Sequence, residues 1–240
     1  MLKYSLFLTG VLLCMFGVAK AQPGIKVTYQ MTFVESESSS TLVKAFKAEN
    51  MPFLIEDSQA VLEADPGQSF FSFGFSKYAN TRKDSTVFSI LVGNPTWQDS
   101  STAYNIIKNQ PGFPEGYIKL LSLQEHPGSL TPWLIQEEHK MIGDYLCFKA
   151  TRMKIRGPKN NIAHPIVAWF CPELPYAFGP LEYGGLPGLI LELQTVNVLF
   201  GARKVSIVDQ VKLPPLPPLP RIKDGQQGAV TAEGLKEQYR

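Results

Sequence analysis

Residue types that commonly carry catalysis are few in this chain and lie far apart along it. The three histidines, His126, His139 and His164, are on separate segments, without the short spacing that two histidine ligands of a zinc site need. Glu138 and His139 have the chemistry of an acid and a base, but adjacent residues on a strand point to opposite faces. We therefore predict no metal or cofactor site, and we expect the histidines in turns or at the surface.

Motifs for nucleophiles, phosphates and redox chemistry are also absent from the sequence. There is no G-x-S-x-G, no Walker loop, no dinucleotide fingerprint and no C-x-x-C. If the protein is an enzyme, we expect a hydrolase or another enzyme of unrecognised type, using Glu182 or His139 with groups brought together from distant loops. A single polar cleft that collects these residues would favour that alternative.

A stretch rich in glycine and proline, residues 183–193, is the most distinctive part of the sequence. Glycine adopts backbone angles that other residues avoid and lets another segment approach closely, whereas proline fixes φ and removes a hydrogen-bond donor. The stretch therefore predicts a sharp turn that leads into a buried strand at residues 189–193. Its glycines either permit tight packing of a loop on the sheet or form the floor of a pocket.

The pocket interpretation needs large side chains as walls, and several lie near the turn in sequence. These aromatic side chains are Trp169, Tyr176, Phe178 and Tyr183. The floor and the approach to it would be Gly179, Pro180, Gly185, Leu186, Pro187 and Gly188. Only two charged residues, Glu182 and Glu192, accompany them, so we favour the packing interpretation over the pocket.

The hexapeptide at residues 185–190, Gly-Leu-Pro-Gly-Leu-Ile, is the one that names the GLPGLI family. Trp133 and the segments 140–151, 168–170, 172–175 and 179–180 match the family in order and spacing. The chain thus resembles GLPGLI proteins, which are exported proteins of Bacteroidetes-type bacteria without an established function. The resemblance extends over residues 133–195. The chain departs from the family pattern at Cys171, where Thr is usual, and at Val167, near which the family often has an arginine.

Residues 1–21 are typical of a secretory signal peptide. Lys3 supplies the positive start, residues 6–18 the apolar core, and Ala19-Lys-Ala21 the cleavage site. The apolar run is shorter than the roughly 20 residues of a membrane anchor. We therefore expect export to the periplasm or the extracellular space, with no transmembrane span after cleavage.

Export changes the charge balance of the mature protein. The whole chain has 23 Lys and Arg against 21 Asp and Glu. Loss of Lys3 and Lys20 with the signal peptide removes that excess and leaves a formally neutral protein. A neutral chain gives no electrostatic reason to expect nucleic acid or an anionic membrane surface as a partner.

Short apolar–polar alternations, separated by turn residues about every dozen positions, indicate strands. We expect them at residues 25–34, 52–56, 59–64, 85–92, 103–108, 117–123, 130–137, 144–156, 162–171 and 196–211, the last broken at Gly201-Ala202. The pattern predicts a mainly β single domain at residues 22–211, built on a curved or partly closed antiparallel sheet with little helix. The aromatic run at residues 70–75 belongs to the core or lines a cavity.

The C-terminal part, residues 212–240, is predicted to be a proline-rich extended arm followed by a flexible tail. Residues 214–220 contain five prolines in seven positions, too few donors for a strand ladder, and favour polyproline II. Such a segment serves either as a spacer or surface-lying arm, or as a ligand for a recognition domain.

Two of the predicted strands, 144–156 and 162–171, flank a turn-rich loop centred near Lys159. If the hairpin is symmetrical about Lys159, residues whose numbers sum to 318 face one another, which places Cys147 opposite Cys171. These are the only cysteines left after signal cleavage in an exported chain, so we predict a disulfide worth roughly 3 kcal/mol on the chain-entropy model. The alternative is two buried free thiols.

The sequence therefore favours a non-catalytic, exported envelope protein that binds an apolar small molecule or another envelope protein. The aromatic run, the aromatic loop and the lack of catalytic spacing support this interpretation. A lipid-sized apolar cavity would favour the small molecule, whereas a solid core would leave binding to a protein. The sequence does not specify an oligomeric state.

Overall fold

The computed structural model describes residues 23–34, 51–74, 92–107, 116–122, 131–156 and 162–223. The predicted signal peptide, the predicted flexible tail beyond residue 223 and His126 lie outside these ranges. Within them, no helix has the length and hydropathy of a membrane span.

The predicted fold class is confirmed, because the described residues form one mainly antiparallel sheet and one short helix, α2. The strands are β1 (Gly24–Phe33), β2 (Gln59–Ala64), β3 (Gln68–Gly74), β4 (Thr96–Asp99), β5 (Thr102–Ile107), β6 (Tyr117–Ser122), β7 (Leu134–Ile142), β8 (Tyr145–Arg156), β9 (Ile162–Cys171), β10 (Leu189–Gln194), β11 (Val198–Val208) and β12 (Arg221–Lys223). Across the sheet they follow the order β12-β6-β5-β4-β3-β2-β1-β11-β10-β9-β8-β7. The sheet is therefore open, with β7 and β12 at its ends.

Alternating side chains explain how the central strands bury one face. In β1, Ile25, Val27, Tyr29 and Met31 are all fully buried, as expected when every second residue of a strand points to the core. The break predicted at Gly201-Ala202 is wrong, because β11 continues through both residues. The register between β1 and β11 shifts just beyond them, where Tyr29 pairs with Ala202 and Thr28 with Lys204, as at a β-bulge.

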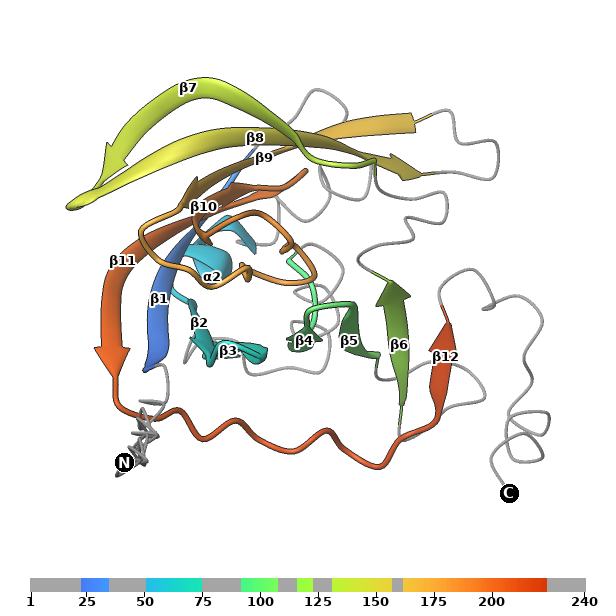
Figure 1. Ribbon diagram of the computed structural model, residues 1–240. Coiled ribbons are helices and arrows are strands. Elements are labelled where there is room, and N and C mark those ends of the chain that lie inside the picture. Colours follow the sequence, from blue (N-terminus) through green and yellow to red (C-terminus); the bar gives the residue numbers. More distant parts are fainter. Residues whose placement is uncertain are drawn as a thin grey trace, which may run out of the picture.

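Figure 1 shows that the sheet curls strongly around its concave side. Strands β7 to β9 form the top of the view, β1 and β11 the side, and β3 to β6 the bottom. Helix α2 and the loop of residues 172–188 lie within this curve. The loop and the helix thus supply the second layer that a one-sided sheet needs to bury its apolar face.

The prediction of a strand at residues 52–56 is wrong, because these residues belong to helix α2 (Met51–Glu56). A proline in the first turn of a helix is tolerated because its missing N–H has no partner there. Leu54 and Ile55 are buried, and α2 packs on β1. The Ser58 hydroxyl donates to the Leu54 carbonyl at 2.7 Å and satisfies a carbonyl near the end of the helix.

The proline-rich segment runs along the sheet between β11 and β12, at the bottom of Figure 1. The indole N–H of Trp97 donates to the Pro214 carbonyl at 2.8 Å. Strand β12 then pairs in parallel with β6, and the Ile118 amide donates to the Pro220 carbonyl at 2.7 Å. These contacts hold the described part of the arm against the domain, and β12 is a strand that sequence reasoning missed.

Glycines in the 172–188 loop allow the loop to touch the strands beside it. A Cβ added to Gly188 would lie 2.2 Å from the carbonyl oxygen of Cys171, and one added to Gly184 would lie 2.8 Å from the carbonyl oxygen of Ala177. Gly185, by contrast, has a φ of 79° but nothing within 4 Å of an added Cβ. The predicted tight packing is therefore confirmed at Gly184 and Gly188.

This difference predicts unequal effects of alanine within one motif. Gly188→Ala forces a backbone clash and is expected to lower the free energy of unfolding by about 3 kcal/mol or more. Gly185→Ala meets only an unfavourable φ and is expected to cost about 1 kcal/mol. Urea unfolding followed by tryptophan fluorescence measures both, and equal losses would contradict the packing.

Candidate functional site

Most of the aromatic side chains predicted to line a pocket are part of the core. Tyr176, Phe178 and Tyr183 are buried, and so is Leu186 within the motif. They belong to the same apolar cluster as Phe71, the centre of the aromatic run in β3. The described aromatic residues of this region therefore pack into the core. This agrees with the interpretation in which the glycines permit tight packing of the loop on the sheet.

Specific hydrogen bonds fix the motif to the sheet. The buried Tyr29 hydroxyl donates to the Ile190 carbonyl at 2.6 Å, and burial raises the pKa of this phenol. The Trp133 indole N–H donates to the Gly184 carbonyl at 2.9 Å, and its ring meets the Tyr183 ring edge-on at 6.4 Å between centroids. Trp133 and Tyr183 are therefore brought together, as packing partners.

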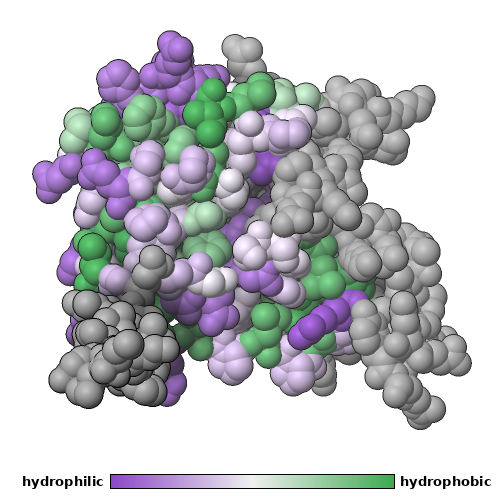
Figure 2. Space-filling model, viewed as in Figure 1, coloured by the Kyte–Doolittle hydropathy of each residue, from purple (hydrophilic) through white to green (hydrophobic). Residues whose placement is uncertain are grey.

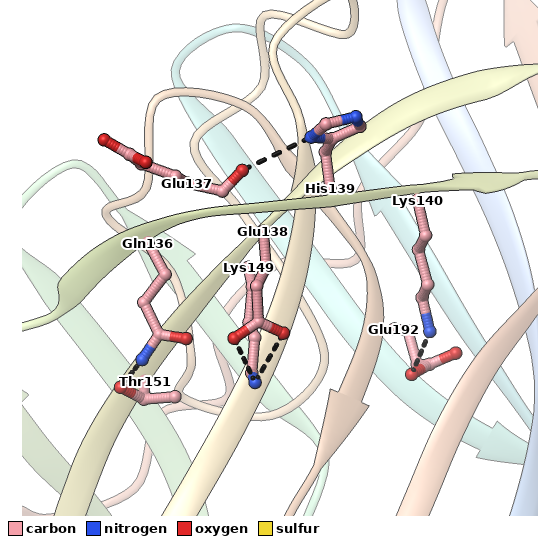
Figure 3. Close-up of polar contacts among 8 residues, drawn as sticks. All are labelled: Gln136, Glu137, Glu138, His139, Lys140, Lys149, Thr151 and Glu192. Atoms are coloured by element: carbon pink, nitrogen blue, oxygen red, sulfur yellow. Dashed lines mark hydrogen bonds and ion pairs between the residues drawn. The ribbon is translucent and has the colours of Figure 1, made fainter.

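Trp169 lies apart from the other predicted wall residues, on an outer face of the sheet. The Lys140 ammonium lies 4.4 Å from the centre of its ring and also forms an ion pair with Glu192 at 2.7 Å. Lys149 lies 6.0 Å from the same ring and pairs with Glu138 at 2.9 Å. Figure 3 shows Glu138 and Lys140 on one side of β7, with Lys149 of β8 and Glu192 of β10 as their partners.

Strand β7 is the most solvent-exposed strand of the described sheet. None of its nine residues is buried. Leu134, Ile135 and Met141 expose 67%, 56% and 59% of their surface. In Figure 2 the top of the molecule, where Figure 1 places β7 and β8, has hydrophobic residues next to hydrophilic ones. This hairpin thus presents apolar groups among charges.

The predicted register of the β8–β9 hairpin is confirmed. Phe148 pairs with Phe170, and all pairs as far as Arg156 and Ile162 sum to 318. Cys147 and Cys171 occupy the next opposed position but are separate buried thiols, so the predicted disulfide is not formed in this structure. The register determines which Cα atoms face one another, but it does not determine whether the two sulfur atoms are bonded. The Cys147 thiol donates to the carbonyl of Tyr145 at 3.6 Å.

A polar cleft of about 200 Å³ opens beside the loop. It is lined by residues from the segment before β4, from β5, β6 and β8, from the loop itself and from the β10–β11 turn. The lining residues are Val92, Gly93, Asn94, Asn105, Ile107, Lys119, Lys154, Leu181, Glu182, Tyr183, Thr195, Val196 and Asn197. Sequence reasoning named only Glu182 and Tyr183 of this set.

The charged centre of the cleft is an ion pair between β8 and the loop. The Lys154 ammonium lies 3.1 Å from Glu182 Oε1 and donates to the Tyr183 hydroxyl at 3.3 Å. Burial raises the pKa of Glu182, but Lys154, the hydrogen bonds to the carboxylate and Lys119 together outweigh burial and lower the pKa overall. Burial is also the main cause of the raised pKa of Tyr183. Glu182 is therefore an ionised carboxylate at neutral pH, a poor general acid.

A strained residue precedes this carboxylate. Leu181 has a φ of 58°, which is rare for a bulky side chain. Its side chain is buried against Gly93, where an added Cβ would lie 2.7 Å from Leu181 Cδ2. The surrounding packing thus holds Leu181 in a costly conformation, and residues of this kind cluster at functional sites.

Neither His139 nor His164 is among the residues that line the cleft. His139 is exposed on β7, where its Nδ1 lies 3.3 Å from the Glu137 carbonyl and its ring 6.1 Å from the Phe148 ring. His164 is buried in β9, so its predicted surface position is wrong. Among the described residues, no three His, Cys, Asp or Glu side chains are placed to hold a metal ion. The structure thus leaves Glu182 and His139 apart.

Comparison with known proteins gives a family match over a short stretch. Residues 158–192 match a family model described as a protein of unknown function (Porph_ging). The matched stretch contains β9, the loop and the hexapeptide at residues 185–190. None of the curated proteins matches the chain.

Among solved structures, the chain is similar to PNGF-II, with 12% sequence identity and a TM-score of 0.45. The alignment covers 79% of this chain and 29% of the PNGF-II chain. The chain therefore spans less than a third of the length of that protein.

Burial of the two cysteines predicts the reactivity of their thiols. Burial raises the pKa of the Cys147 thiol to about 12 and raises that of Cys171 as well. We expect iodoacetamide at about pH 8 to leave both unmodified in the folded protein, because the thiolate is the reactive form. After unfolding in urea without reductant, both should be alkylated. Mass spectrometry that finds neither modified in the unfolded chain would indicate a disulfide instead.

The Lys154–Glu182 pair predicts a loss of stability in acid. A carboxylate whose pKa is lowered on folding stabilises the protein above its unfolded pKa of about 4.3, and that contribution is lost as the pH falls through the lower folded value. Glu182→Gln should therefore be less stable than the parent at pH 7, with a difference that shrinks below about pH 4.

The matched control for this measurement is Glu138→Gln. Glu138 pairs with Lys149 at 2.9 Å, but its side chain is 62% exposed, whereas that of Glu182 is 12% exposed. Exposed pairs contribute little to stability, so this variant should unfold like the parent at each pH. Denaturant titrations between about pH 3 and pH 7 compare the three proteins. A Glu182→Gln difference that does not change with pH would contradict the account.

Proposed function

We propose that this chain is an exported, non-catalytic member of the GLPGLI family that binds another envelope protein through its β7–β8 hairpin. The overlap between the family match at residues 158–192 and the hexapeptide supports the family assignment. The signal-peptide pattern at residues 1–21 supports export. The observation that carries the binding function is the exposure of β7.

A strand without a buried residue contributes little to its own domain. Ordering a strand costs conformational entropy, which burial of side chains normally offsets. Leu134, Ile135 and Met141 instead expose most of their apolar surface to water. Exposed apolar groups rimmed by charges are typical of protein interaction sites, and methionine is enriched at such sites. A partner that covers the hairpin would bury these three side chains.

The partner docks on the faces of the hairpin in this proposal, not along its open edge. The β7–β8 register shifts between Ile135 and His139, so the centre of β7 bulges. Charged residues occupy the same part of the strand. Bulges and charges on an edge strand oppose the addition of another strand. A groove in the partner that contacts both faces of the hairpin is therefore more compatible with β7 than an added strand.

A protein partner is favoured over an apolar small molecule because the aromatic residues fill the core. Phe71 meets Phe73 and Phe200 edge-on, at 5.1 Å and 5.8 Å between ring centroids. Tyr176 and Phe178 are buried in the same cluster. The cleft beside the loop is polar at its centre and does not suit a lipid.

Charge introduced at Met141 tests the proposal, with a matched control on β11. Met141→Asp should weaken partner binding by about tenfold or more while the stability stays within about 0.5 kcal/mol, because the side chain is exposed. Ile207 exposes 61% of its surface and is a residue of β11, so Ile207→Asp introduces the same charge elsewhere. It should bind the partner like the parent.

The partner is first captured by photo-crosslinking in the native cells, with p-benzoyl-phenylalanine at position 141 or 207. We expect position 141, and not position 207, to give an adduct with a second envelope protein, and Leu134→Asp to abolish it. Equal adducts from both positions, no adduct from position 141, or only an adduct of the chain with itself would each refute the proposal.

A further inference from the structure

The polar cleft beside the loop has no role in the binding function proposed above. Its volume is about 200 Å³, and residues from widely separated parts of the chain line it. Two lysines, one carboxylate and three asparagines contribute side chains to it. Three features of these groups indicate the kind of molecule that the cleft accepts.

The first feature is a nearly balanced charge. Glu182 pairs with Lys154 at 3.1 Å, and both side chains are mostly shielded from solvent. Lys119 also acts on Glu182 and favours its ionised form. An anion that entered the cleft would approach this carboxylate, and a cation would approach the two ammonium groups. The electrostatics therefore favour a neutral ligand.

The second feature is a set of amide side chains that need both donors and acceptors. The buried Thr96 hydroxyl donates to Asn105 Oδ1 at 2.5 Å, which leaves the NH₂ group of that amide as a donor. Asn197 is buried, and its Oδ1 has no hydrogen-bond partner. A buried acceptor without a donor is costly and rare in folded proteins, so it calls for a group that the ligand supplies.

The third feature is the strain at Leu181, immediately before Glu182. Its φ of 58° is held by packing against Gly93, across the cleft lining. Strain that persists in a well-packed loop is typical of a site whose groups are arranged before the ligand arrives. The carboxylate is thus fixed in place by two independent restraints, the loop backbone and Lys154.

From these features we infer that the cleft binds a small, neutral, polyhydroxylated molecule of about the size of one sugar residue. A hydroxyl group both donates and accepts, so it can donate to Asn197 Oδ1 or Glu182 and accept from the Asn105 amide or Lys119. The volume lies below the roughly 300–1,000 Å³ of sites for drug-sized ligands, which limits the ligand to about one ring.

The test is a titration of the mature, signal-cleaved protein with glucose, N-acetylglucosamine and myo-inositol, followed by amide NMR. Acetate and inorganic phosphate form the anion arm of the same experiment. We expect at least one of the neutral compounds to shift the amides of residues 181–183 and 195–197 in a saturable way. No saturable shift from any neutral compound, or shifts from the anions alone, would overturn the inference.

Asn197→Ala distinguishes a ligand group from a structural one. Removing an acceptor that has no partner should leave the melting temperature equal or higher, while binding of the neutral compound weakens by about tenfold. Asn94→Ala is a second site variant, because the contact between Asn94 and the Thr96 hydroxyl, at 3.0 Å, is made by the backbone carbonyl of Asn94 and is kept in alanine. Gln194→Ala removes an exposed amide three residues from Asn197 and should bind like the parent. Unchanged binding in both site variants would refute the assignment.

Discussion

The loop of residues 172–188 crosses the concave side of the sheet with almost no clearance, and most of the structure depends on that contact. Added Cβ atoms at Gly179 and Gly184 would each lie 2.6 Å from a neighbouring atom, and one at Gly188 would lie 2.2 Å away. Because the loop packs this closely, its aromatic side chains fill the interior. A single curled sheet with one described helix thereby obtains a second layer for its core.

The same packing positions both surfaces to which we assign a role. The loop bends sharply over the core and carries Glu182 into the polar cleft, where Lys154 of β8 meets it. On the other side of the β8–β9 hairpin, β7 extends beyond the core and stays exposed. A rigid interior between two accessible regions suits a protein that recognises other molecules.

Local patterns in the sequence predicted much of the fold, whereas contacts between distant segments could not be predicted. Alternation gave β2 and β9 at their observed bounds, and the symmetrical loop gave the β8–β9 register. Residues 51–56 contain too few positions for periodicity to separate helix from strand. The Lys154–Glu182 pair and the unpartnered Asn197 depend on long-range packing, so no spacing in the sequence signals the cleft. The sequence predicted that Cys147 and Cys171 oppose one another, but it could not predict whether their sulfur atoms are free thiols or form a disulfide.

Native-state amide hydrogen exchange tests most directly whether this loop is part of the core. The amides of Gly185, Leu189 and Ile190 donate to carbonyls of the loop at Ala177, Leu174 and Phe178, at 2.9–3.0 Å. If the loop is core, these amides exchange only on global unfolding, with the same free energy as those of β1. Exchange of these amides in a separate, low-energy opening while β1 and β11 stay protected would show a movable flap and contradict the account.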